Sequence, residues 1–134
     1  EEELRAWVEV MDLPIDMVRR YDDYVNHRSQ FDTHQGVKGL EFERVIVIID
    51  DSEAKGFLFS YDKLFGIKDL SEADLKNKDN GKETSIERTQ RLFYVTCTRA
   101  KSSLAVVMYT NNPEGVKTEA IRKGWFEENE IVVM

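Results

Sequence analysis

Two short, almost continuous apolar runs constrain the fold of this chain more than any other feature. The first, over 44–49, contains V-I-V-I-I between Arg44 and Asp50, and the second, over 103–109, reads S-L-A-V-V-M-Y. A β-branched run of this length without alternation is typical of a strand buried on both faces, as in a parallel sheet. The two runs therefore predict two strands of a mainly parallel sheet.

Helical periodicity before, between and after these runs indicates an α/β fold. Apolar residues recur at i, i+3, i+4 and i+7, and Thr84-Ser85 followed by Glu87 is typical of a helix start. Such an order predicts a layered α/β domain with ligands at the carboxyl ends of its strands. The expected elements are helices over 1–11, 14–28, 85–100 and 114–123, strands over 44–49 and 103–109, and a final short strand over 131–134.

The segment 50–85 shows no clear period. Its part 56–67 is rich in aromatic residues, including Phe57 and Tyr61, and its part 71–85 is polar. A structureless connection of this length is uncommon inside a compact domain, so we interpret it as a functional insertion or a partly disordered segment. The aromatic part 56–67 is expected to plug the sheet, with a docking loop for a protein partner as the alternative.

Composition excludes several classes of protein. The chain has 134 residues with a single cysteine, which rules out a disulfide-stapled scaffold, and no apolar run approaches the roughly 20 residues of a membrane helix. We therefore expect no membrane partner and a cytoplasmic location. Lys and Arg total 19 against 26 Asp and Glu, for a net charge of -7. Domains that act mainly by gripping phosphate backbones are usually basic, so the isolated chain should bind nucleic acid weakly.

The segment Thr33–Phe42, directly before the first strand, carries groups that suit a nucleotide. Gly36 and Gly39 allow backbone N–H groups to approach an anion, and Lys38 can serve as a phosphate counter-charge. The Glu41 carboxylate can accept hydrogen bonds from sugar hydroxyls. The alternative is an ordinary turn with its lysine in solvent.

The segment Gln90–Lys101 forms the second group of interest. An arginine held at a helix end, as Arg99 would be, suits the charge that develops on a transferring phosphoryl group. The alternative is a salt-bridge partner. We expect Tyr94 to pack and Cys97 to be a small core residue rather than a nucleophile.

Together these segments resemble motifs V and VI of the UvrD/PcrA/Rep-like superfamily 1 DNA helicases. Thr33–Val47 is similar to T-x-H-x-x-K-G-L-E-F-x-x-V, and Glu87–Leu104 to E-R-R-L-x-Y-V-x-x-T-R-A-K-x-x-L. The resemblance implies a RecA-like (P-loop NTPase-like) fold: a fragment of the second motor domain of an ATP-dependent DNA helicase active in DNA repair. By this resemblance, residues 1–134 form a single domain fragment with five parts. These are a helical lead-in over 1–30, motif V with its strand over 31–49, the insertion over 50–85, motif VI with its strand over 86–110, and a terminal helix and strand over 111–134.

The resemblance also implies roles for individual residues. Arg99 looks like the arginine finger that reaches the γ-phosphate, and Glu41 like the carboxylate that holds the ribose. Lys38 and Gly39 would lie at the nucleotide edge. Single-stranded DNA would contact the turn of Thr33, His34 and Gln35; here Gln35 stands at the position of the family's histidine, and His34 is shifted by one.

The sequence contains no G-x-x-x-x-G-K-[ST] phosphate loop. The resemblance implies that ATP with Mg²⁺ is bound together with the N-terminal RecA-like domain of the same protein, which would supply the Mg²⁺ ligands. We expect no metal site in this chain and no ATPase activity of the chain alone. The alternative function is a non-catalytic protein- or nucleic-acid-binding module on a degenerate helicase fold. Convergence of Glu41 and Arg99 on one open edge would favour the helicase.

Overall fold

The computed structural model describes residues 2–26, 28–54 and 58–134. The chain divides into two compact units, Glu1–Gly36 and Val37–Met134. Gly56 and Phe57 of the aromatic segment lie outside the described residues. The organisation of 1–134 as a single domain fragment stays a prediction.

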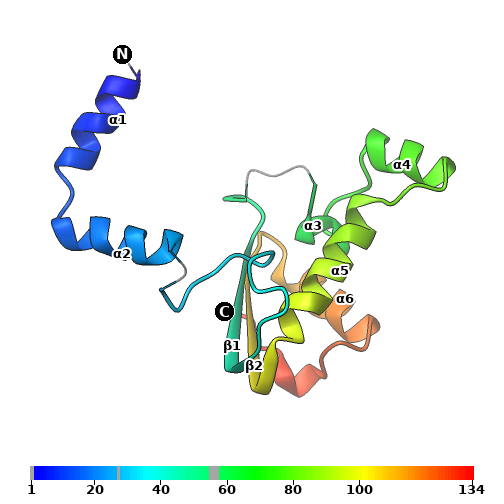
Figure 1. Ribbon diagram of the computed structural model, residues 1–134. Helices are drawn as coiled ribbons and strands as arrows, with labels where there is room; N and C mark the ends of the chain where they lie inside the picture. The colour runs from blue at the N-terminus through cyan, green and yellow to red at the C-terminus, as the bar shows by residue number, and fades with distance from the viewer. Residues whose placement is uncertain (1, 27, 55–57) are drawn as a thin grey trace. The chain divides into compact units, whose positions relative to one another are not determined.

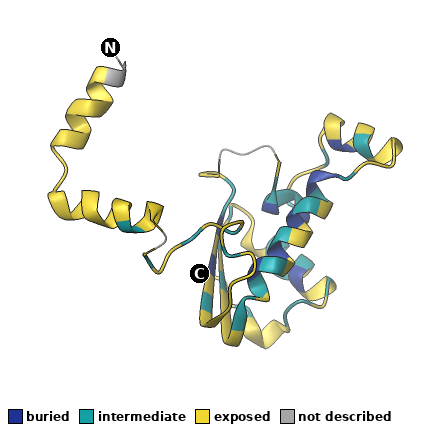
Figure 2. Cartoon of the chain, in the orientation of Figure 1, coloured by how far each residue is buried: buried dark blue, intermediate teal, exposed yellow. Residues whose placement is uncertain are grey.

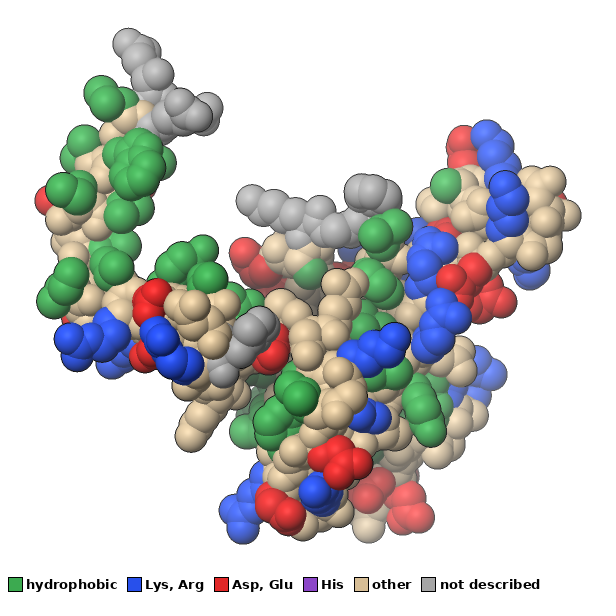
Figure 3. Space-filling view, viewed as in Figure 1, with side chains coloured by type: hydrophobic (Ala, Val, Ile, Leu, Met, Phe, Trp, Pro, Cys, Tyr) green, Lys and Arg blue, Asp and Glu red, His purple; other side chains and the backbone are tan. Residues whose placement is uncertain are grey.

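The first unit contains two helices, α1 (Glu2–Met11) and α2 (Ile15–Val25), as predicted (Figure 1). Pro14 directly precedes α2, in keeping with the preference of proline for helix starts. The helix ends at Val25, earlier than predicted, and Arg28 then pairs with Asp22 and Asp23. The apolar side chains of both helices are largely exposed (Figure 3).

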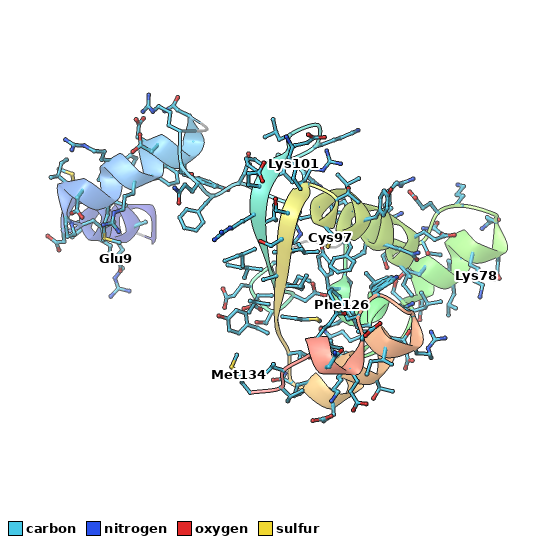
Figure 4. The ribbon with its side chains drawn as sticks, turned by 90° about the horizontal axis from the view of Figure 1, so that it is seen from below. Glu9, Lys78, Cys97, Lys101, Phe126 and Met134 are labelled. Carbon is cyan, nitrogen blue, oxygen red and sulfur yellow. The ribbon has the colours of Figure 1, made fainter. Side chains whose placement is uncertain are left out.

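The second unit is built on a parallel pair of strands, β1 (Phe42–Asp50) and β2 (Ala100–Tyr109). The helix α5 (Ser85–Cys97) lies between them in the chain, as a parallel connection requires. Helices α3, α5 and α6 lie on one side of the sheet in both views (Figures 1 and 4). The predicted α/β class with a parallel sheet is therefore confirmed, and it is consistent with a small RecA-like fragment.

The prediction that both faces of the strands are buried is wrong for the described residues. On β1, Val47 and Ile49 are 2% and 1% exposed, whereas Ile46 and Ile48 are 69% and 54% exposed. Successive side chains of a strand point to opposite faces, and the described helices of this unit cover only one of them. The continuous apolar run therefore produces one buried face and one open apolar face.

The insertion is more structured than its sequence suggests. It contains α3 (Tyr61–Leu64) and α4 (Glu72–Asp79), which are capped by Ser60 and Ser71. Helices this short leave little periodic signal, which explains why sequence reasoning missed them. Tyr61 and Phe65 are buried and pack edge-to-face on Phe93 of α5, with ring centroids 6.0 Å apart in each pair. Figure 2 shows buried positions gathered on α3, α5 and the sheet. This burial agrees with the expectation that the aromatic part 56–67 packs over the sheet.

The chain continues through α6 (Pro113–Arg122) and a short 3-10 helix, Glu128–Glu130. The final strand predicted over 131–134 is wrong, because these residues have no strand partner. Ile131 packs against the core while Val132 is exposed. None of the helices in the described ranges has the length and apolarity needed to span a bilayer.

Candidate functional site

The amino ends of β1 and β2 bring Glu41 and Arg99 together. Glu41 immediately precedes β1 and Arg99 immediately precedes β2. The Phe42 N–H donates to the Arg99 carbonyl oxygen at 2.8 Å, and Phe42 pairs with Ala100 in the sheet. The two predicted site residues therefore lie side by side on one edge. Both residues stand before their strands, at the amino ends, whereas the sequence predicts ligands at the carboxyl ends.

The Arg99 guanidinium is fixed by uncharged acceptors. Its Nε donates to the Val95 carbonyl oxygen at 2.8 Å, one terminal nitrogen donates to the Leu40 carbonyl oxygen at 3.0 Å, and the other donates to Thr98 Oγ1 at 3.0 Å. Among the described residues, no ion pair includes Arg99. The side chain is half-buried and joins the end of α5 to the residue before Glu41. Its positive charge is thus positioned without being neutralised by a carboxylate.

The Glu41 carboxylate is exposed and pairs with one cation. Its Oε2 lies 3.2 Å from Lys101 Nζ, and the side chains of Glu41 and Lys101 are 63% and 52% exposed. An ion pair this open to solvent contributes little to stability. The carboxylate therefore remains accessible as a hydrogen-bond acceptor.

Lys38 and Gly39 form a turn before Glu41. The Leu40 N–H donates to the Val37 carbonyl oxygen at 3.1 Å, and Gly39 has φ of 85°. This conformation favours glycine because a Cβ would strain the backbone there. Lys38 is exposed. All four predicted nucleotide residues thus belong to the segments that enter the two strands.

The predicted DNA-contacting residues form a turn of their own in the unit Glu1–Gly36. The Gly36 N–H donates to Thr33 Oγ1 at 3.0 Å, and the Thr33 N–H donates to an Asp32 carboxylate oxygen at 2.7 Å. A Cβ on Gly36 would lie 2.1 Å from that oxygen, so this tight turn requires glycine unless Asp32 moves. Thr33 and Gln35 are exposed and His34 is half-buried.

The helix α5 turns one face to the core and the other to solvent. Its buried residues include Thr89, Phe93 and Thr96, whereas Tyr94 is 68% exposed. The expectation that Tyr94 packs is therefore wrong, because it points away from the buried stripe. Burial raises the pKa of the Cys97 thiol to about 11, so the group stays protonated at neutral pH. This agrees with a core residue rather than a nucleophile.

Sequence reasoning missed a polar group around a buried carboxylate, which we name the Asp74 cluster and which consists of Lys63, Ser71, Asp74 and Ser85. The Asp74 carboxylate accepts hydrogen bonds from Lys63 Nζ at 2.6 Å, Ser71 Oγ at 2.7 Å and the Ser85 N–H at 2.7 Å. Desolvation raises the pKa of Asp74, but the donors from Lys63, Ser85 and Ser71 outweigh it and hold this pKa well below its usual range. The spacing Ser71-x-x-Asp74, typical of a capping box, was the available signal.

Within the described part of the chain, no group of three His, Cys, Asp or Glu side chains could hold a metal ion. One unneutralised guanidinium and one exposed carboxylate lie on a common edge. A guanidinium can bind a phosphate, and a carboxylate can accept hydrogen bonds from hydroxyl groups.

Comparisons with known proteins agree with these motifs. The family model of the UvrD-like helicase C-terminal domain matches residues 33–111, which is more than half of the chain and includes both segments described above. Searches of curated proteins and of solved structures find no match. Because the family match spans the strands, the helix between them and both motifs, this chain belongs to the UvrD-like helicase C-terminal domain family.

Proposed function

We propose that this chain is the C-terminal motor domain of an ATP-dependent DNA helicase or translocase. In this proposal Arg99 is the arginine finger, Glu41 binds the ribose, and Lys38 and Gly39 line the nucleotide edge. The observation that carries the proposal is the common location of Glu41 and Arg99 at the amino ends of two paired strands. Residues so far apart in the sequence have no local reason to meet there.

The chemistry of these groups fits an ATP site shared with another domain. An arginine finger stabilises charge that develops on the γ-phosphate and is worth about 10³–10⁵ in turnover. Arg99 is suited to this role because carbonyl oxygens hold its guanidinium while its charge is not neutralised. The Mg²⁺ ligands and the phosphate loop would come from the N-terminal motor domain. Closure of the two domains would then bring Arg99 to the phosphates.

Single-stranded DNA is the proposed second ligand. Thr33 and Gln35 are exposed hydrogen-bonding side chains in a tight turn, and His34 lies between them. Such groups can contact phosphate oxygens without reading sequence. Hydrolysis and strand stepping would be coupled because the same motif V segment continues from this turn to Glu41.

One observation favours a second function, that of a non-catalytic binding module. The three hydrogen bonds of Arg99 also join motif VI to motif V, so this arginine could serve only to hold the fold together. In that case removal of the Arg99 side chain would lower the stability of the fold but would have no specific effect on ATP turnover by the full-length protein.

Replacement of Arg99 in the full-length protein separates these functions. We expect Arg99→Ala to lower DNA-stimulated ATP turnover by about 10³-fold or more while ATP affinity changes little. Arg99→Lys should also be impaired, because an ammonium lacks the planar fork of a guanidinium. Arg122→Ala, which removes an exposed arginine paired locally with Glu119, is the matched control. Near-normal turnover of a folded Arg99→Ala enzyme would remove Arg99 from the proposed role.

A further inference from the structure

The beginning of β2 contains one more residue than the strand beside it. Phe42 pairs with Ala100 and Arg44 pairs with Ser103, so β1 advances by two residues while β2 advances by three. Lys101 and Ser102 therefore stand opposite Glu43 alone. Such a bulge breaks the regular alternation of side chains and re-aims the residues within it, and bulges are enriched next to active sites.

Both residues of the bulge bind carboxylates of the motif V strand segment. Lys101 Nζ lies 3.2 Å from Glu41 Oε2, and Ser102 Oγ donates to Glu43 Oε2 at 2.6 Å. Figure 4 labels Lys101 at the end of the sheet where β2 begins. The irregular register thus presents a cation to the carboxylate proposed to bind ribose.

The pair leaves half of the carboxylate open. A carboxylate offers about four lone-pair sites on two oxygens. Lys101 approaches Oε2, and among the described residues no other side chain forms an ion pair or a hydrogen bond with the Glu41 carboxylate. The other oxygen, Oε1, can accept hydrogen bonds from sugar hydroxyls while Lys101 restrains the rotation of the side chain.

We propose that Lys101 is a positioning residue that orients Glu41 and thereby sets the preference of the site for a ribonucleotide over a deoxyribonucleotide. This inference rests on the proposed function, because it needs Glu41 at the sugar. It assigns Lys101 a part in nucleotide binding, distinct from the part of Arg99 in turnover.

Equilibrium binding to the full-length protein tests the proposal. Calorimetric titrations would use a non-hydrolysable ATP analogue and its 2′-deoxy and 3′-deoxy forms. We expect Lys101→Ala to weaken binding of the ribonucleotide about two- to fivefold, which is the range of an exposed ion pair, and to abolish its advantage over the deoxy forms. Lys101→Arg should keep this advantage. Turnover at saturating ATP should stay within about twofold of the unmodified protein.

Control variants distinguish a wrong role for Lys101 from a wrong role for Glu41. Lys78→Ala removes an exposed lysine of α4 and should change none of these values (Figure 4). If Glu41→Ala abolishes the sugar preference but Lys101→Ala keeps it, or if Lys101→Ala tightens binding, the role of Lys101 is wrong and the proposed function stands. If Glu41→Ala itself leaves the preference intact, the ribose-binding role of Glu41 is wrong, and the inference falls with it.

Discussion

At the residue scale, the buried carboxylate of Asp74 joins two parts of the second unit. It is 3% exposed, and it connects α3 through Lys63 and the beginning of α5 through Ser85. A buried charge is tolerated only when it is paired and hydrogen-bonded, and removal of one partner leaves the other uncompensated. The Asp74 cluster therefore fastens the insertion to the motif VI helix.

We expect Asp74→Asn to lower the free energy of unfolding by about 3 kcal/mol at pH 7, because it leaves the Lys63 ammonium unpaired in a largely buried site. The folded-state pKa of Asp74 lies below its ordinary value of 3.8, so its stabilising contribution is present above that pH and is lost as the pH falls further. The difference between the two proteins should therefore shrink by about 1 kcal/mol at pH 3. Urea denaturation of the two proteins at pH 7 and at pH 3 measures the difference in stability at each pH.

The exposed Asp79 provides the control for this prediction. Asp79→Asn at the end of α4 should change stability by less than about 0.5 kcal/mol at either pH. A difference between Asp74→Asn and the unmodified protein that is equal at pH 7 and pH 3 would contradict the assigned direction of the pKa shift.

At the element scale, α5 connects the Asp74 cluster to the candidate site. Its amino end is closed by a capping box in which the Thr84 N–H donates to Glu87 Oε2 at 2.7 Å and the Glu87 N–H donates to Thr84 Oγ1 at 3.3 Å. Phe93 in its middle packs on α3, and Arg99 follows directly after its C-cap, Thr98. The position of the Arg99 guanidinium thus depends on how α5 packs.

Loss of the cap should loosen α5. We expect Thr84→Ala to cost about 1–2 kcal/mol of stability, because two backbone N–H groups at the helix start lose or weaken their partners. Thr118→Ala on the exposed surface of α6 should cost less than about 0.5 kcal/mol. Denaturant unfolding gives both values, and hydrogen exchange should show faster opening of the first turn of α5. Equal stability of the two variants would refute the importance of the cap.

At the scale of the whole molecule, charge and sequence content limit what the chain does alone. The net charge of -7 opposes binding to phosphate backbones, while the segment 84–112 carries four basic residues and one acidic residue. The chain also contains no phosphate loop. Under the proposed function, contacts of this chain with a nucleotide and with DNA would therefore depend on a second domain.

For the 134-residue chain alone we expect no ATP turnover above background, with or without single-stranded DNA. We also expect weak binding of single-stranded DNA that falls on the order of tenfold between 50 and 200 mM salt, as a few phosphate contacts would give. Phosphate release and fluorescence anisotropy measure these properties. Turnover by the pure chain, abolished by Arg99→Ala, would show that the missing phosphate loop is not required.

Local sequence signals predicted most of the elements in the second unit. The cap Thr84, the periodic helix after it and the two apolar runs depend on neighbours in the chain, and α5, β1 and β2 form where they predict. The prediction of a terminal strand over 131–134 is wrong because a strand needs a partner, and a short apolar run does not specify one. The prediction that Tyr94 packs is wrong because the elements that pack on α5 decide which of its faces is covered.

The sequence by itself determined the family, the class of fold and the identities of the candidate site residues, because motif composition and hydrophobic period are properties of neighbouring residues. Only the tertiary structure decided that Glu41 and Arg99 meet at the amino ends of the strands, that a bulge turns Lys101 toward Glu41, and that one sheet face stays open. These features depend on strand register and on which helices pack where. They are set by contacts between residues that are distant in the chain, and no local pattern encodes such contacts.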